Sequence, residues 1–166
     1  MDYFDCIEKR FSCRNFKDDK IPRDILNKVL EAGILAPTAC NYQPERILVV
    51  EDIDTIEKLK EGTRYTFNAK TLLIISHDKN VSWHRGNDGL DHGSIDSAIV
   101  ATQITLSLTA LGLASCFVCS MREGVVKEIL GLPDNYQVDI ILPIGYPSEV
   151  KSHNSRKKLE EIVTFK

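Results

Sequence analysis

The sequence predicts an α/β or α+β fold, because apolar segments with strand-like and helix-like patterns alternate along its 166 residues. A chain of this length typically forms one domain with its own hydrophobic core, so we expect a single domain spanning residues 1–166. Hydrophobic residues make up 43% of the chain and charged residues 27%, a globular composition that excludes disordered and fibrous proteins.

Four shorter segments are expected to form helices. Residues 3–9 follow Asp2, whose carboxylate can cap a helix. Pro22 can open a stronger amphipathic helix, which ends before Pro37. Two further amphipathic helices are expected at residues 54–61 and 124–130.

The segment 94–111 has an ambiguous pattern. Ile104, Leu106 and Leu108 alternate with polar residues, which is typical of a strand. The segment is too long for an ordinary strand, however, and a glycine follows it, as at the end of many helices. We therefore expect a helix that is capped by Ser94, apolar on most sides and buried at the centre of the fold.

The expected strands are rich in branched apolar residues and lie between the helices. They cover residues 46–50, 72–76, 114–119 and 138–144. The longest loop, residues 78–93, is polar and contains the only tryptophan, Trp83. This side chain is either an anchor packed on the body of the domain, which we favour, or part of a lid over a binding site.

Charge and composition exclude several classes of protein. The chain has 21 basic and 24 acidic residues and a net charge of −3, which disfavours general binding to nucleic acids or membrane surfaces. No apolar run is long enough to span a bilayer, and the N-terminal segment does not resemble a signal peptide. Because five cysteines are an odd number, we expect reduced thiols in a cytoplasmic protein.

The residues most suited to binding an anion are Arg10, Ser12 and Arg14. In an extended segment these alternate side chains share one face, and two guanidinium groups with a hydroxyl suit a phosphate. The spacing alone equally fits a solvated basic surface, which is the commoner case. Arg156 and Lys157 would complete an anion site if the C-terminal tail folds back onto this segment.

Two other motifs are open to more than one interpretation. The proline-stiffened loop at residues 36–44 could grip a ligand or simply join a helix to a strand. Cys116 and Cys119 form a CxxC pair without a second pair, which does not support a zinc site. We interpret both as buried structural cysteines in a strand, with redox chemistry as a minor alternative. The four histidines, His77, His84, His92 and His153, have no metal-ligand spacing.

Taken in order, five segments resemble the FMN-dependent nitroreductase family over nearly the whole chain. They are RFSCRNF (10–16), APTACNYQP (36–44), SIDSAIVATQITLSLTALGLASCFV (94–118), LPIGYP (142–147) and RKKLEEIV (156–163). The resemblance implies a mixed central sheet flanked by helices and an intertwined homodimer with FMN at its interface. The chain departs from the family at Glu45, where an aromatic residue is common, and at Lys158, where a proline is common.

The resemblance also implies roles for individual residues. Arg10 and Ser12 would hold the FMN phosphate and ribityl end, and Arg14 would reach the pyrimidine side of the flavin. Arg156 and Lys157 would close the phosphate site, and Gly145 would lie by the ribityl chain. The residues implied near the flavin ring are Val118, Cys119 and Ser120. The other subunit would contribute Pro37, Thr38 and Asn41. No residue is assigned as a catalytic acid or base, and no metal is expected.

The activity implied by the resemblance is hydride transfer from NADH or NADPH to FMN, followed by reduction of a small acceptor such as a nitroaromatic or a quinone. Two alternatives belong to other classes of protein: a flavin-binding carrier or sensor with little turnover, and a small dithiol redox protein using Cys116 and Cys119.

Overall fold

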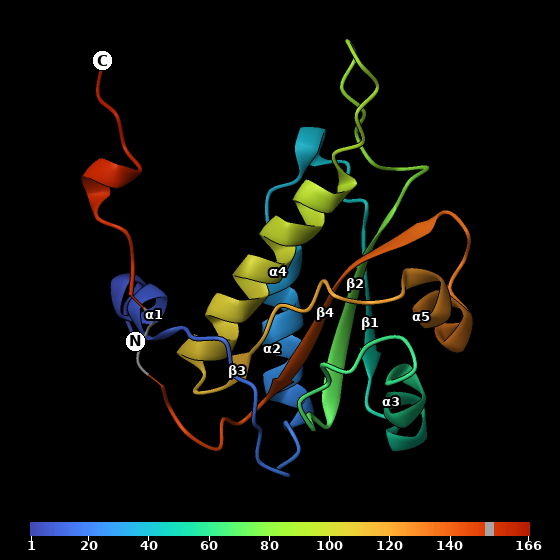
Figure 1. The fold of residues 1–166 in the computed structure, drawn as a ribbon, viewed down its shortest axis with the longest axis vertical. Helices are drawn as coiled ribbons and strands as arrows, with labels where there is room; N and C mark the ends of the chain where they lie inside the picture. Colours follow the sequence, from blue (N-terminus) through green and yellow to red (C-terminus); the bar gives the residue numbers. More distant parts are fainter. Residues whose placement is uncertain (152–154) are drawn as a thin grey trace.

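The computed structural model describes residues 1–151 and 155–166, so His153 lies outside the described residues. Its elements, in chain order, are α1 (Tyr3–Lys9), α2 (Arg23–Ile34), the 3-10 turn η1 (Ala39–Asn41), β1 (Glu45–Val50), α3 (Ile53–Leu59), β2 (Thr71–Asp78), α4 (Gly93–Ala110), β3 (Ala114–Ser115), α5 (Glu123–Leu130), β4 (Tyr136–Gly145) and the 3-10 turn η2 (Leu159–Glu161). Figure 1 shows their arrangement. No described helix is long and apolar enough to cross a membrane.

A four-stranded sheet forms the centre of the fold, with its strands in the order β1-β2-β4-β3. Helices α2 and α4 cover one face, and α3 and α5 cover the other (Figure 1). The predicted α+β class is therefore confirmed. The ladders between these strands are antiparallel, and the parallel pairing among the described residues is an isolated bridge between Ser12 and Ser115.

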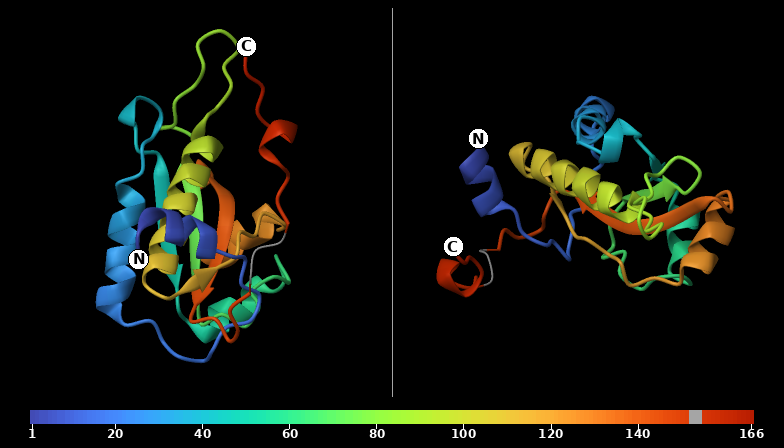
Figure 2. Two further views of the ribbon diagram at one scale, coloured as in Figure 1. Left: turned by 90° about the vertical axis from the view of Figure 1, so that its left-hand side faces the viewer. Right: turned by 90° about the horizontal axis from the view of Figure 1, so that it is seen from above.

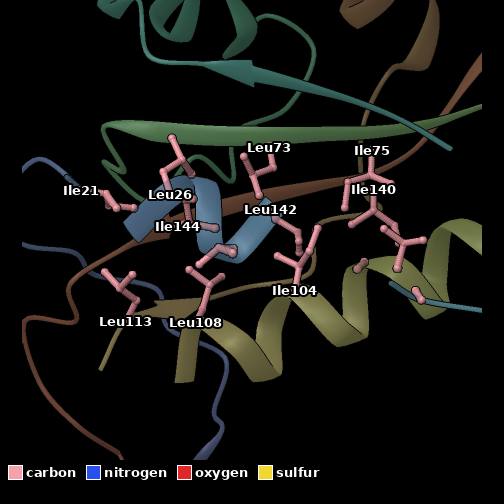
Figure 3. Packing of buried hydrophobic residues seen from close by; sticks show 14 residues of the cluster. Ile21, Leu26, Leu73, Ile75, Ile104, Leu108, Leu113, Ile140, Leu142 and Ile144 are labelled. Carbon is pink, nitrogen blue, oxygen red and sulfur yellow. The ribbon is translucent and has the colours of Figure 1, made fainter. Parts of the chain in front are cut away.

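Strand β2 is buried along its whole length, and its apolar side chains project from both faces of the sheet. Leu73 and Ile75 point toward α2 and α4, where they pack with Ile104 and Leu142 (Figure 3). The intervening Ile74 belongs to a second cluster formed with α3 and α5. Two cores thus hold the helices to the sheet, one on each face.

The ambiguous segment 94–111 is confirmed as a helix, α4. The predicted cap is wrong, because His92 precedes the helix and the Ser94 hydroxyl donates a hydrogen bond to Asp139 Oδ1 (2.6 Å). Helix α2 approaches α4 closely at Gly33, where an added Cβ would lie 2.7 Å from Ile104 Cγ1. Only glycine fits this contact without a shift of the helices.

The predicted strand 114–119 is shorter than expected. Regular pairing ends after Ser115, and a single bridge joins Val118 to Ile141. The interruption has a local cause, because Pro143 of β4 accepts a hydrogen bond from the Cys116 N–H but has no N–H to return one. The segment after Ser115 therefore follows β4 without forming a full ladder.

The loop between β2 and α4 projects from one end of the molecule (Figure 1). Trp83 is half-buried and packs edge-on against His92, with 4.8 Å between the ring centroids. His92 is half-buried as well. The contact supports the interpretation of Trp83 as an anchor at the base of the loop.

A buried histidine ties three elements together at this end of the sheet. His77 of β2 is 1% exposed, and its Nδ1 lies 2.7 Å from Asp139 Oδ2 of β4. Its Nε2 lies 3.3 Å from Asp91 Oδ2 in the loop, a distance suited to charge attraction. Ser94 and Ser97 of α4 donate hydrogen bonds to the same Asp139 carboxylate. The network fixes the first turn of α4 to the sheet.

Charge reinforces this network. Burial lowers the pKa of His77, but the hydrogen bond to Asp139 and the charges of Asp139 and Asp91 outweigh it, so the pKa is raised. Burial raises the pKa of Asp139, but hydrogen bonds from His77, Ser94 and Ser97 outweigh it, so that pKa is lowered. The pair is therefore stabilised in its charged form.

We expect this network to make stability depend on pH. Because the folded-state pKa of His77 is raised, the interaction with Asp91 contributes fully below the unfolded pKa of about 6.5 and is lost as pH rises through the folded value. Urea denaturation of the wild type and Asp91→Asn should therefore differ most near pH 5.5 and least at pH 9. His84 Nε2 lies 3.7 Å from Asp91 Oδ2 and would add its own pH dependence. Both the reference protein and the Asp91→Asn variant should therefore also carry His84→Gln. A difference that is constant with pH would contradict the prediction.

Candidate functional site

Main-chain hydrogen bonds hold the predicted anion-binding segment against the sheet. The Cys13 N–H donates to Ser115 O (2.9 Å), and the Lys17 N–H donates to Tyr146 O (2.9 Å). The segment therefore runs in extended form between β3 and the end of β4, as predicted. Its position depends on backbone atoms at both ends, which places Arg10, Ser12 and Arg14 beside the residues that follow β3.

A cavity of about 280 Å³ lies next to this segment. Arg14 comes from the segment itself, and much of the remaining lining comes from the chain after β3. The lining residues are Arg14, Tyr65, Phe67, Cys116, Phe117, Val118, Cys119 and Ser120. The structure thus brings together four of the predicted site residues, namely Arg14, Val118, Cys119 and Ser120.

Ser12 forms a backbone bridge with Ser115, the residue before the cavity-lining Cys116, although neither Ser12 nor Arg10 lines the cavity itself. Burial raises the pKa of the Cys116 thiol, whereas the charge of Arg14, a hydrogen bond with Ser12 and the charge of Arg10 all act to lower it. The three predicted phosphate residues therefore lie around one cysteine. Within the described ranges, neither Arg10 nor Arg14 forms an ion pair with a carboxylate. Their positive charge remains available to an anionic ligand.

Gly145 lies at the end of β4, where it pairs with Ala114. An added Cβ would lie 3.1 Å from Phe16 Cδ1, which is tighter than ordinary contact. Glycine at this position therefore lets the extended segment pack closely on the sheet. The implied role beside a ribityl chain stays a prediction.

Tyr65 and Phe67 line the cavity but were not predicted from the sequence. Their ring centroids are 5.9 Å apart, and the guanidinium of Arg64 lies 5.0 Å from the centroid of Tyr65. Phe67 and Asn68 both have left-handed backbone angles, with φ of 52° and 58°, which non-glycine residues adopt at some cost. One sequence signal could have identified this wall of the cavity: two large aromatic residues occur in a segment that has no helix or strand pattern.

The CxxC pair differs from the prediction in one respect. Cys116 is buried as expected, but Cys119 is exposed and both line the cavity. The Ser115–Ile144 and Val118–Ile141 pairings are three positions apart on each strand, so the chain between them is extended. The Cα atoms of Cys116 and Cys119 are then about 10 Å apart, beyond the reach of a disulfide. This spacing argues against the dithiol alternative.

The loop at residues 37–41 lies at the opposite end of α4 from the cavity. The Ala39 N–H donates to Asp96 in the first turn of α4, whereas the cavity-lining residues 116–120 come after the last turn of α4 and β3. Figures 1 and 2 show the loop after α2 and strand β3 at opposite ends of α4. At 1.5 Å per residue, Asp96 lies roughly 20 Å from the last residue of α4. Pro37, Thr38 and Asn41 are therefore not brought together with Arg14 within one chain.

Arg156 and Lys157 lie on a C-terminal arm, residues 155–166, that stands apart from the sheet (Figures 1 and 2). Neither residue lines the cavity beside Arg14. The arm ends in large apolar side chains exposed to solvent, among them Ile162 at 70% and Phe165 at 86% exposure.

Known proteins share both the sequence pattern and the fold. A model of the Nitroreductase family matches residues 7–64 and 62–146. An NADH dehydrogenase from Thermus thermophilus is 27% identical over 190 aligned positions, covering 95% of this chain and 93% of that protein.

Two solved structures have the same architecture. A nitroreductase family protein from Clostridium difficile 630 is 35% identical, with a TM-score of 0.94 and coverage of 99% of this chain and 98% of that one. An FMN-dependent nitroreductase from Clostridium difficile R20291 is 28% identical, with a TM-score of 0.82 and coverage of 96% of each chain. The fold, the order of the motifs and the family match agree, and the chain belongs to the nitroreductase family.

Proposed function

We propose that this chain is an FMN-dependent oxidoreductase, which takes a hydride from NADH or NADPH and reduces a small acceptor, such as a nitroaromatic or a quinone, in a two-step exchange. The observation that carries the proposal is a cavity lined by Arg14 and Cys116 in a nitroreductase-family fold, with Arg10 and Ser12 acting on the same cysteine. We further propose that residues 1–166 form one FMN-binding domain and that the protein works in the cytoplasm.

The cavity has the chemistry that FMN requires. Two guanidinium groups and a hydroxyl suit the phosphate, because arginine donates in a planar fork and serine adds a neutral donor. Tyr65 and Phe67 offer an aromatic wall for a flat ring, and the chain from Val118 to Ser120 lines the same cavity as Arg14. FMN is the cofactor that these residues fit.

The protein residues bind and orient the reactants. Bound FMN supplies the hydride chemistry, as cofactors do in oxidoreductases generally. Arg14 would place a positive charge beside the ring and so favour the negative charge that develops there on reduction. Tyr65 and Phe67 would keep water from one side of the cleft. We assign no catalytic acid or base, because protons can come from water.

A single chain provides only part of the site. The cavity of about 280 Å³ is slightly smaller than the roughly 300–1,000 Å³ typical of small-molecule sites. Pro37, Thr38 and Asn41 lie at the far end of α4, so in this proposal they reach the cavity of a second subunit. Arg156 and Lys157 would close the phosphate site.

Exposed apolar surface supports a homodimer. A groove of about 680 Å³ runs along α4 and is lined largely by apolar side chains, including Ile95 and Ile99, which are 50% and 37% exposed. The apolar C-terminal arm is a second such surface. Exposed apolar side chains gathered on such features are typical of protein interfaces.

The function is tested by the colour and kinetics of the purified protein. We expect visible flavin absorbance and oxidation of NADH or NADPH that depends on an added acceptor. Initial rates at several fixed acceptor concentrations should give parallel double-reciprocal lines. A protein that binds no FMN would contradict the proposal. A protein that binds FMN without turnover would instead support the carrier or sensor alternative.

Arg10→Ala should weaken FMN binding without unfolding the protein. A hydrogen bond between charged groups contributes about 1.5–3 kcal/mol, so the Kd should rise about ten- to hundredfold in a fluorescence titration. The matched control is Arg23→Ala. Arg23 is an exposed arginine at the start of α2, where it is already paired with Glu51. Equal Kd values for the two variants would place the phosphate elsewhere.

The protein should be a dimer in solution. Light scattering of the FMN-saturated protein should give about twice the chain mass of 18.7 kDa. An Ile99→Glu variant, which places a charge in the groove along α4, should shift the equilibrium toward the monomer and weaken FMN binding. A wild-type protein that remains monomeric with FMN bound would contradict the dimeric site.

A further inference from the structure

One buried carboxylate connects α4 to the loop at residues 38–43. Asp96 lies in the first turn of α4 and is 2% exposed. Its Oδ1 accepts a hydrogen bond from the Ala39 N–H (2.9 Å), although 57 positions separate the two residues. The bond joins the loop to the helix end that Ser94 and Ser97 fasten to Asp139.

The second oxygen of this carboxylate is unusual. Asp96 Oδ2 is buried and has no hydrogen-bond partner among the residues that the structure describes. A buried polar oxygen without a partner destabilises a fold, and such groups are therefore rare. Among the described residues, the hydrogen bond from the Ala39 N–H is therefore the interaction that offsets the burial of this carboxylate.

The loop needs an external support because its own backbone is strained. Cys40, Asn41 and Gln43 have φ angles of 51°, 56° and 51°, in the left-handed region that favours glycine. Local bonds hold part of the shape, since the Gln43 N–H donates to Thr38 Oγ1 (3.1 Å). Strained residues persist when the surrounding structure fixes them, and they concentrate at functional sites.

We propose that Asp96 is a positioning residue, which holds residues 38–41 in the shape that contacts the FMN bound by the partner subunit. This inference rests on the proposed function, because the flavin gives the loop its ligand. Asp96 acts through the Ala39 N–H and does not itself touch the cofactor. The His77–Asp139 network holds the helix end from which Asp96 acts.

The test compares Asp96→Ala with Ser97→Ala. Both residues are buried in the same turn of α4, but Ser97 bonds to Asp139 and not to the loop. Two measurements are needed: the Kd for FMN, and amide hydrogen exchange of the peptide covering residues 36–44 without FMN. Asp96→Ala should raise the Kd about tenfold, the effect of one lost buried hydrogen bond, and speed exchange in the loop. Ser97→Ala should change both by less than about twofold, because His77 and Ser94 still bond to Asp139 and hold this end of the helix.

Two further variants separate positioning from general stability. Asp96→Asn keeps an oxygen acceptor for the Ala39 N–H and should restore the Kd to within about threefold of the wild type. Ala39→Pro removes the donor from the loop side and leaves the helix intact. The preceding residue, Thr38, already has the extended angles that a following proline requires (φ −127°, ψ 159°). Both changes remove the same hydrogen bond, from the Ala39 N–H to Asp96. Ala39→Pro combined with Asp96→Ala should therefore weaken binding no more than either change alone.

The outcomes are distinct. If Asp96→Ala and Ser97→Ala lower the melting temperature equally and leave the Kd and loop exchange unchanged, Asp96 is only structural. If Asp96→Ala cannot be folded, Ala39→Pro with unchanged Kd and exchange overturns the proposal equally well. A wild-type protein that binds no FMN would refute the proposed function, and loop exchange would still decide whether Asp96 holds the loop.

Discussion

The site depends on main-chain hydrogen bonds that fix residues 12–17 to the edge of the sheet. The Cys13 N–H bonds to Ser115 and the Lys17 N–H bonds to Tyr146, so both ends of the segment are fixed by backbone atoms. An extended segment presents alternate side chains on one face, which directs Arg10, Ser12 and Arg14 together. The Ser12–Ser115 bridge holds the segment beside the start of the chain that follows β3, and Arg14 lines a cavity with that chain.

Helix α4 separates two halves of a site. Its last turn leads to the cavity beside Arg14, and its first turn holds the loop at residues 38–41 through Asp96. The rigid helix keeps these halves apart within one chain. An arrangement of two chains that brings the loop of one subunit to the cavity of the other would complete both sites at once. The exposed apolar groove along α4 and the apolar arm are surfaces that such an arrangement would bury.

Most of the fold could be predicted because local pattern determines it. Helices α1 and α2 follow from Asp2 and Pro22, and length alone identifies α4 despite its mixed pattern. The early end of β3 was missed because it depends on the proline of a strand distant in sequence. The roles of His77 and Asp96 were missed for the same reason, since their partners lie 62 and 57 positions away. Arg14 and Cys119 could be assigned to one site only through the family resemblance, because periodicity does not reveal contacts between distant segments.

The central claim is that FMN occupies the cavity between Arg14 and the chain after β3. It is tested most directly by alkylation of Cys119, an exposed thiol on the cavity wall, followed by mass spectrometry of the modified peptides. Saturating FMN should slow modification of Cys119 about tenfold or more, since a bound ligand that covers a thiol blocks its access to reagent. AMP, which has a phosphate but no flavin ring, should not protect it. Equal rates of Cys119 modification with and without bound FMN would contradict the account.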